Sequence, residues 1–211
     1  MELKRALLLA LCTCAVTAAH AGDYVLEIDG QKVEIDLDRP ASANVGDKKA
    51  KIVLHQKTEQ TWREEGISFV HPAAFAPSRR NLDKNITQTI MTTPSGTIVL
   101  VQHYIGTDPT PLVDMMVGKL SDDEVTAGYK REIKYAARQL ADGTMLSGKS
   151  VRTEHPGDTW EREVLASGDH DAGFLIVAAV NDSSTDADRA MMEKFWRTLR
   201  LAKPGALEPL E

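Results

Sequence analysis

The segment that most constrains the fold is 97–105, Thr-Ile-Val-Leu-Val-Gln-His-Tyr-Ile, which is apolar on both faces at its start. A continuous apolar run of this length predicts a central strand that other layers cover on each side. The β-branched segment 85–93 precedes it, and Pro94-Ser95-Gly96 between the two is typical of a turn. These segments predict paired strands inside a sheet.

Alternating polar and apolar residues predict further strands along the chain. Segments 24–28 and 32–37 flank Asp29-Gly30, a dipeptide typical of hairpin turns. The interval 39–48 is rich in turn-forming residues and predicts a loop. The remaining expected strands are 52–62, 66–70, 145–153, 159–166 and 174–180.

Three segments carry apolar residues at helical spacing. The first is 110–120. The sequence Ser121-Asp-Asp-Glu124 then matches a capping box and predicts a second helix that runs to about Leu140. The third helix ends near Leu199. Hairpins joined to apolar helix stripes predict an α+β fold, an antiparallel β-sheet flanked by helices (an α/β sandwich), as a single domain over residues 22–202, followed by a loose tail at 203–211.

Two short segments of the sequence resemble those of a known family. Residues 66–75, Gly-Ile-Ser-Phe-Val-His-Pro-Ala-Ala-Phe, look like the opening strand of the DcrB-like and PsbP-like α/β sandwich proteins, and residues 193–200, Glu-Lys-Phe-Trp-Arg-Thr-Leu-Arg, look like their terminal helix. The resemblance covers about residues 48–201. It implies an antiparallel sheet flanked by helices and a role in binding or assembly, with no catalytic residue set to carry over.

The first 21 residues have the three parts of a secretory signal peptide. Lys4 and Arg5 form a basic start, the run 6–19 is apolar, and Ala19-His20-Ala21 supplies small residues for cleavage before Gly22. An amphipathic first helix and a lipoprotein signal at Cys12 are the alternatives. The apolar run has no polar face, and a bulky leucine directly before Cys12 does not fit a lipidation signal.

Export and composition together restrict the function. The chain's two cysteines lie in the leader, so the mature protein would hold no disulfide, which favours a bacterial periplasm over a secreted, disulfide-bonded protein and leaves an extracellular location as the alternative. The net charge of −6 argues against nucleic acid as a partner. The apolar run at 6–19 is too short to span a membrane.

The most suggestive polar cluster is Asp169-His170-Asp171, because carboxylates and imidazole can hold zinc or transfer protons. Its surroundings, Ser-Gly before and Ala-Gly after, are typical of a hairpin turn. His103 and His155 are further candidates for a metal or acid–base site, whereas a buried structural histidine explains His103 more simply. No nucleophile elbow, phosphate-binding loop or dinucleotide fingerprint is present in the sequence.

Trp62 and Arg63 are the candidate partner-binding residues. An aromatic ring among Thr, Glu, Gln and Arg is either the core-filling edge of a strand or an exposed anchor for a partner. The sequence therefore predicts an exported, non-enzymatic protein that binds another protein or a cell-envelope component, without a cofactor or metal. An envelope immunity protein, an inhibitor or an assembly factor would fit. The alternative is a small metal-dependent or histidine-using periplasmic hydrolase with a site near His103, His155 and His170.

Overall fold

The structure is a computed structural model that describes residues 24–202 except residue 65. The signal peptide predicted at 1–21 and the tail predicted at 203–211 lie outside the described residues. The chain divides into two compact units, residues 1–56 and 57–211. This boundary falls inside the range 22–202, which the sequence predicts to be a single domain.

The first unit consists of two antiparallel hairpins. The chain passes from the first hairpin to the second at residues 36–39, and Asp38 donates its backbone N–H to the carbonyl of Leu54 (2.9 Å). Ile35 and Ala43 are its buried hydrophobic residues among those described. The strands are β1 (Tyr24–Ile28), β2 (Gln31–Ile35), β3 (Pro40–Val45) and β4 (Lys48–Val53).

The predicted hairpin at 24–37 is confirmed, and the loop predicted at 39–48 is wrong. Residues 40–45 form β3 and pair in register with β4. The turn between them is confined to Gly46 and Asp47, where Gly46 adopts a φ of +59° that favours glycine.

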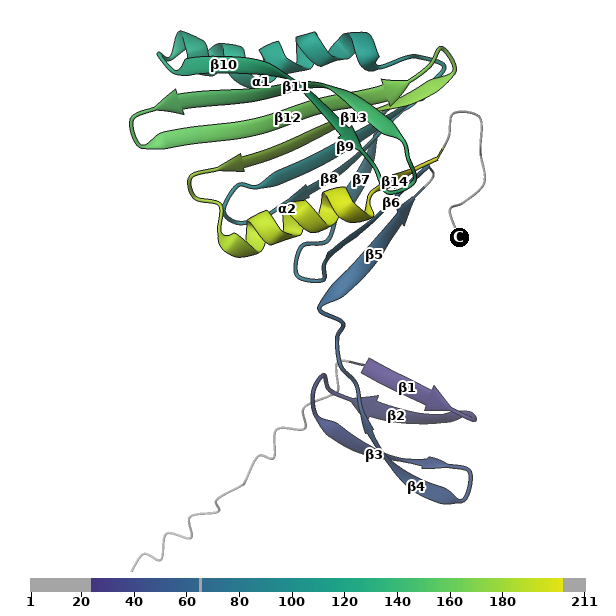
Figure 1. The fold of residues 1–211 in the computed structure, drawn as a ribbon. Helices are drawn as coiled ribbons and strands as arrows, with labels where there is room; N and C mark the ends of the chain where they lie inside the picture. Colours follow the sequence, from purple (N-terminus) through teal and green to yellow (C-terminus); the bar gives the residue numbers. More distant parts are fainter. Residues whose placement is uncertain (1–23, 65, 203–211) are drawn as a thin grey trace, which may run out of the picture. The chain divides into compact units, whose positions relative to one another are not determined.

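The second unit is built on one seven-stranded antiparallel sheet with the strand order β10-β11-β12-β13-β9-β8-β7 (Figure 1). A three-stranded sheet, in the order β14-β6-β5, accompanies it. The strands of the large sheet are β7 (Ser78–Asp83), β8 (Ile86–Thr92), β9 (Ile98–Ile105), β10 (Lys130–Gln139), β11 (Met145–His155), β12 (Asp158–Gly168) and β13 (Ala172–Asn181). Those of the small sheet are β5 (Glu59–Glu64), β6 (Ile67–Pro72) and β14 (Arg200–Leu201).

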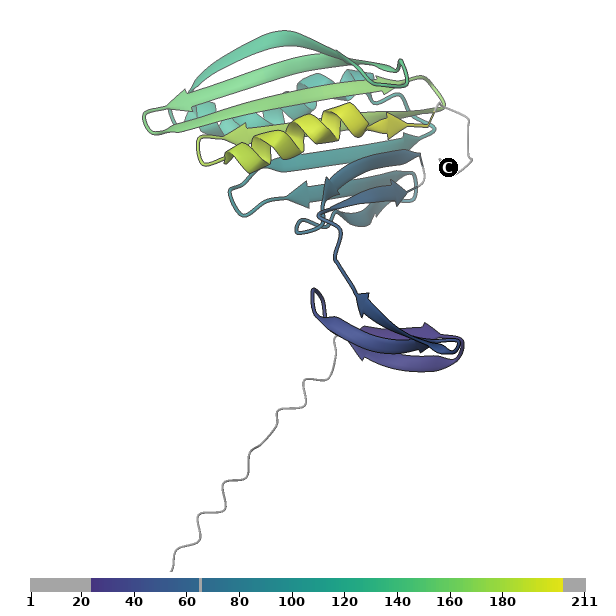
Figure 2. The ribbon, with the colours of Figure 1, turned by 60° about the horizontal axis from the view of Figure 1, so that its bottom comes forward.

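Alternate residues of the central strands enter two separate cores. Along β13, Phe174 and Ile176 belong to one core, whereas Leu175 and Val177 belong to the other. The first core also contains β6 and α2 (Asp186–Thr198), and the second contains α1 (Val113–Thr126). The two helices therefore lie on opposite faces of the sheet, here named the α2 face and the α1 face (Figure 2). The prediction that 97–105 is a central strand covered on both sides is confirmed.

The predicted helix-flanked α+β sandwich is wrong. The fold is mostly antiparallel β, with 57% strand and 17% helix, and the described residues contain two α-helices and one short 3₁₀ turn at Thr110–Leu112. The error lies at residues 121–140. Helix α1 runs through the expected cap and ends near Gly128, whose φ is +97°, and residues 130–139 form strand β10. Ser121 is no cap, because its hydroxyl is buried within α1 and donates to the carbonyl of Val117 (2.8 Å).

The start of α2 is fixed to the β8–β9 turn by the carboxylate of Asp188. Thr185 and Asp188 form a capping box, and the Ser95 hydroxyl donates to Asp188 Oδ2 (2.6 Å). Burial of the carboxyl group would raise its pKa. The hydrogen bonds from Ser95, from Thr185 and from Thr93 outweigh burial and lower the pKa of Asp188 from 3.8 to about 2.

We predict that Asp188→Asn lowers the free energy of unfolding at neutral pH by about 2 kcal/mol. Because the folded-state pKa lies below the ordinary value, the contribution is present above pH 4 and is lost as the pH falls toward 2. Urea denaturation measured between pH 7 and pH 2 should show a flatter pH dependence in the variant. Asp186→Asn, which alters an exposed carboxylate in the same first turn, is the control and should leave the pH dependence unchanged.

Candidate functional site

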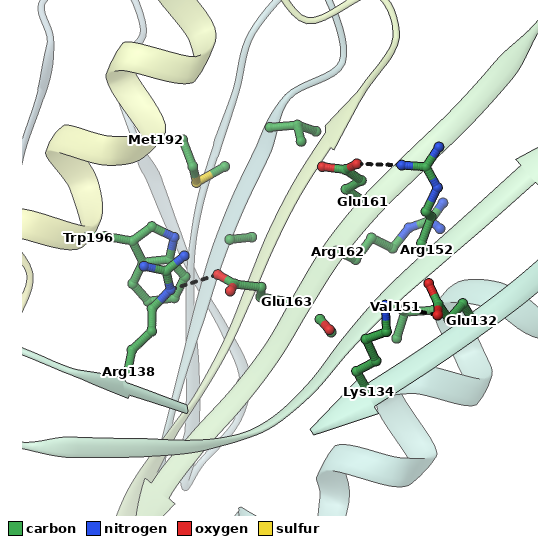
Figure 3. Close-up of a pocket in the computed structure, with 13 residues that line it drawn as sticks. Glu132, Lys134, Arg138, Val151, Arg152, Glu161, Arg162, Glu163, Met192 and Trp196 are labelled. Atoms are coloured by element: carbon green, nitrogen blue, oxygen red, sulfur yellow. Dashed lines mark hydrogen bonds and ion pairs between the residues drawn. The ribbon is translucent and has the colours of Figure 1, made fainter. Parts of the chain in front are cut away.

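The candidate site is a hollow of about 660 Å³ on the α2 face, here named the open-face pocket (Figure 3). Strands β10 to β13 form its floor, and helix α2 forms one wall. Its volume lies within the usual range for sites that bind small molecules or short peptide segments. The lining residues are Glu132, Lys134, Arg138, Ser150, Val151, Arg152, Glu161, Arg162, Glu163, Ala178, Val180, Met192 and Trp196.

The pocket exists because α2 and the small sheet cover only part of the α2 face. Over β9 and β13 that face is apolar, with Val99, Val101 and Ile176 buried in the first core. Over β10, β11 and β12 the residues of the same face become charged, as at Lys134, Arg152 and Glu161 (Figure 3). Successive side chains of a strand point to opposite faces of a sheet. Each of these charged residues lies an even number of positions from a residue of the first core on its own strand, so its side chain points to the α2 face.

The charges of the pocket occur as three pairs of opposite sign (Figure 3). Lys134 Nζ lies 2.8 Å from Glu132, and Arg152 lies 2.8 Å from Glu161, its direct neighbour across β11 and β12. The Lys134 and Glu132 side chains are 66% and 57% exposed. Pairs so exposed contribute little to folding stability, which leaves them free to exchange partners with a charged ligand.

The third pair, Arg138 with Glu163, is held more tightly. Arg138 Nε donates to Glu163 across the intervening strand β11 (2.8 Å). On that face of β11, Gly148 has no side chain and Ser150 has a small one, which leaves room for the contact. The Arg138 guanidinium also lies 4.6 Å from the centre of the Trp196 ring. A guanidinium held between a carboxylate and an indole is oriented for recognition of a carboxylate or another planar polar group.

The lining of the pocket carries charges of both signs. Neither histidine nor cysteine occurs among its lining residues, and its one hydroxyl is that of Ser150. Carboxylates and charged nitrogen groups beside an apolar indole wall are suited to a peptide segment or another polar chain with mixed charges.

A second polar cluster lies on the α1 face, below the end of α1. Arg162 turns its guanidinium away from the pocket and donates to Glu124 of α1 (3.0 Å) and to the Thr153 hydroxyl (2.9 Å). Thr153 in turn donates to Glu124 (2.5 Å). Arg162 is only 7% exposed, so Glu124 is what neutralises a buried charge there.

Close to this pair, the phenol of Tyr129 donates to Asp158 (2.5 Å) and its ring lies 5.1 Å from that of His155. The hydrogen bond to Asp158 is the main cause that raises the pKa of Tyr129, followed by burial and by the charges of Asp158 and Glu124. The phenol therefore stays protonated as a donor and attaches the segment after α1 to the β11–β12 turn.

The structure places the two predicted partner-binding residues on β5, away from the pocket. Trp62 is half-buried and packs against the first core, and its indole nitrogen is buried without a hydrogen-bond partner among the described residues. Of the two interpretations of Trp62, core filling at a strand edge fits this placement. Arg63 is exposed on the same strand.

The histidines of the hydrolase hypothesis are not brought together. His155 is the last residue of β11 and His170 lies in the β12–β13 turn, so the two are at opposite ends of β12, whose 11 residues span about 33 Å. His103 lies on β9 and stacks on Phe174 with ring centres 4.6 Å apart.

Among the described residues, Asp169, His170 and Asp171 do bring three potential metal ligands within 4.8 Å of one another. All three are exposed. The Asp169 carboxylate already accepts hydrogen bonds from the backbone N–H groups of Asp171 (2.9 Å) and Ala172 (3.2 Å). The cluster therefore has the geometry of a capped hairpin turn.

Comparisons with known proteins give no family for this chain: no family model matches it, and no curated protein is significantly similar to it. In the part of the chain that the structure describes, neither helix has the length and apolar character that crossing a lipid bilayer requires.

Sequence reasoning missed the open-face pocket. Its signal was the segment 130–134, Lys-Arg-Glu-Ile-Lys. Lys130, Glu132 and Lys134 are spaced two apart, as on one face of a strand. A helix over this segment would not predict that Arg138 comes within hydrogen-bond distance of Glu163.

We predict that Glu124→Gln lowers the free energy of unfolding by about 3 kcal/mol, because it leaves the Arg162 charge buried and unpaired. Glu132→Gln is the matched control: it removes an exposed ion pair and should cost less than 1 kcal/mol. Urea denaturation followed by tryptophan fluorescence measures both. Equal losses in the two variants would contradict a stabilising role for the buried pair.

Proposed function

We propose that this protein is a non-catalytic binding protein of the bacterial periplasm, and that its open-face pocket receives a mixed-charge segment of another protein or of a cell-envelope component. The observation that carries the proposal is the abrupt change along the α2 face from a covered apolar half to an open half of paired charges. Charged side chains in this position add nothing to the core, so an external partner is the simplest account of their arrangement.

The export signal predicted from the sequence supports the same proposal. The basic start, apolar run and Ala19-His20-Ala21 of the first 21 residues favour delivery to the periplasm. The resemblance of residues 48–201 to the DcrB-like and PsbP-like proteins implies a role in binding or assembly, although the helix-flanked fold that it also implies is not the fold observed. An envelope immunity or inhibitor protein is one specific form of this function, since a net charge of −6 is compatible with a basic target.

The location can be tested directly. Expression of the full chain in a Gram-negative host should yield a protein in the periplasmic fraction whose N-terminal sequence begins at Gly22. Substitution of Leu8 and Leu9 by arginine should retain the protein in the cytoplasm, because the apolar run is interrupted. Recovery of an uncleaved chain from the cytoplasm in both cases would contradict export.

The binding function can be tested by capture of partners from periplasmic extract with the purified protein, followed by mass spectrometry. Arg138→Ala should reduce recovery of a specific partner at least tenfold, because it removes the guanidinium that bridges Glu163 and Trp196. A synthetic segment of that partner should show the same loss of affinity in calorimetry.

Arg79→Ala is a closely matched control. It breaks an Arg–Glu pair of similar length and exposure, to Glu64 at 2.7 Å, outside the pocket. It should leave recovery unchanged. Equal recovery by the Arg138 variant and the unsubstituted protein would contradict the use of this pocket.

A further inference from the structure

Strand β10 is an edge of the seven-stranded sheet that is long, regular and unusually exposed. It pairs with β11 along all ten residues, and its outer side has no strand partner among the described residues. Two large hydrophobic side chains stand on it in solvent, Tyr135 at 78% exposure and Ile133 at 41%. Free edge strands with exposed hydrophobic residues are templates for the addition of another strand.

We propose that β10 pairs antiparallel with β10 of a second copy of this chain, about a two-fold axis at Ile133, to form one continuous sheet across a homodimer. The proposal does not depend on the proposed binding function, and either can fail alone.

Symmetry restricts how two copies of the strand can pair. A two-fold axis perpendicular to the sheet keeps the α1 and α2 faces of both copies aligned, and directly opposed residues must point to the same face. The axis must therefore pass midway between a residue and the same residue of the second copy. With the axis at Ile133, Glu132 lies opposite Lys134 of the second copy, and Lys134 opposite Glu132, so two ion pairs form on the α2 face.

The α1 face of the same register is complementary too. Ile133 lies opposite its own copy. Arg131, whose guanidinium is bound to Asp122 and Ser121 of α1, lies opposite Tyr135, so the aliphatic part of the Arg131 side chain lies beside the aromatic ring. Pairing in this register thereby removes exposed hydrophobic surface of Ile133 and Tyr135 from water.

The neighbouring registers are less favourable. An axis at Glu132 or at Lys134 sets that residue opposite its own copy, so like charges meet directly. An axis at Tyr135 sets Glu132 opposite Arg138, whose guanidinium is already bound to Glu163 and lies against Trp196. The order of charges along β10 thus favours one alignment.

The opposite edge of the sheet, β7, lacks these properties. It has six residues, its pairing to β8 is irregular between Asn81 and Asp83, and Arg79 and Arg80 give its middle a single sign of charge. Bulges and like charges are common devices that prevent strand addition. The contrast between the two edges of one sheet indicates that the β10 edge is suited to association.

Dimerisation would also extend the open-face pocket. Glu132 and Lys134 line the pocket and lie at the proposed interface. The two-fold axis therefore places the partner's Glu132 and the partner's Lys134 at the rim of each pocket, and the two hollows become continuous across the dimer.

A charge-swap series measured by sedimentation equilibrium tests the register. Seven paired residues bury a small area, so a weak dimer is expected and samples of up to about 100 μM are needed. Glu132→Lys alone and Lys134→Glu alone each set like charges opposite across the axis and should weaken the dimer at least tenfold. The double variant Glu132→Lys with Lys134→Glu restores opposite charges and should restore the affinity.

Both single variants remove an exposed pair within the strand, so thermal unfolding should confirm that they remain folded. Leu82→Ala, on the β7 edge, is the control and should not change the dimer affinity. A monomer at all concentrations, or a double variant as weak as the single ones, would overturn the proposal.

Disulfide formation tests the axis independently. The side chain at the axis faces its own copy at a separation that a disulfide can bridge, so Ile133→Cys should form a covalent dimer on mild oxidation. The unsubstituted chain under the same oxidation controls for Cys12 and Cys14. A covalent dimer with Tyr135→Cys but not with Ile133→Cys would overturn an axis at Ile133.

Discussion

The second unit depends on strands β13 and β9, and on the end of β12 around Leu165, being buried on both faces. Leu165 and Leu175 are fully buried on opposite faces of the sheet, although they lie on neighbouring strands. A strand apolar on both sides needs a covering layer on each side, which α1 supplies on one face and α2 with the small sheet on the other. Because α2 and the small sheet leave the α2 face open over β10 and β11, these strands carry charged residues there.

Sequence patterns predicted the central strand at 97–105 correctly and the outer strand at 130–139 wrongly. The segment 97–105 has few polar residues, so its position in the middle of a sheet follows from its composition alone. The segment 130–139 was misjudged because Tyr129, Ile133 and Ala137 are spaced four apart and also fit a helix. Gly128 was the contrary signal, since a glycine with positive φ ends α1 there.

The candidate site could not be predicted from local patterns, because each of its contacts joins residues distant in sequence. Arg138 meets Glu163 and Trp196 only because β10, β11 and β12 are adjacent and α2 lies beside them. Local reasoning succeeded where the determinants are local, as at the turn 169–171. It selected Trp62 from its polar neighbours, whereas the fold packs that ring against the core.

The first unit has a different consequence for the molecule. Its described residues bury Ile35 and Ala43, whereas the second unit holds two extensive cores. Domains this small rarely gain enough apolar burial to be stable alone. The amides of β1 to β4 should therefore exchange with deuterium much faster than those of β12 and β13, so that the chain opens from its first hairpins while the large sheet remains intact.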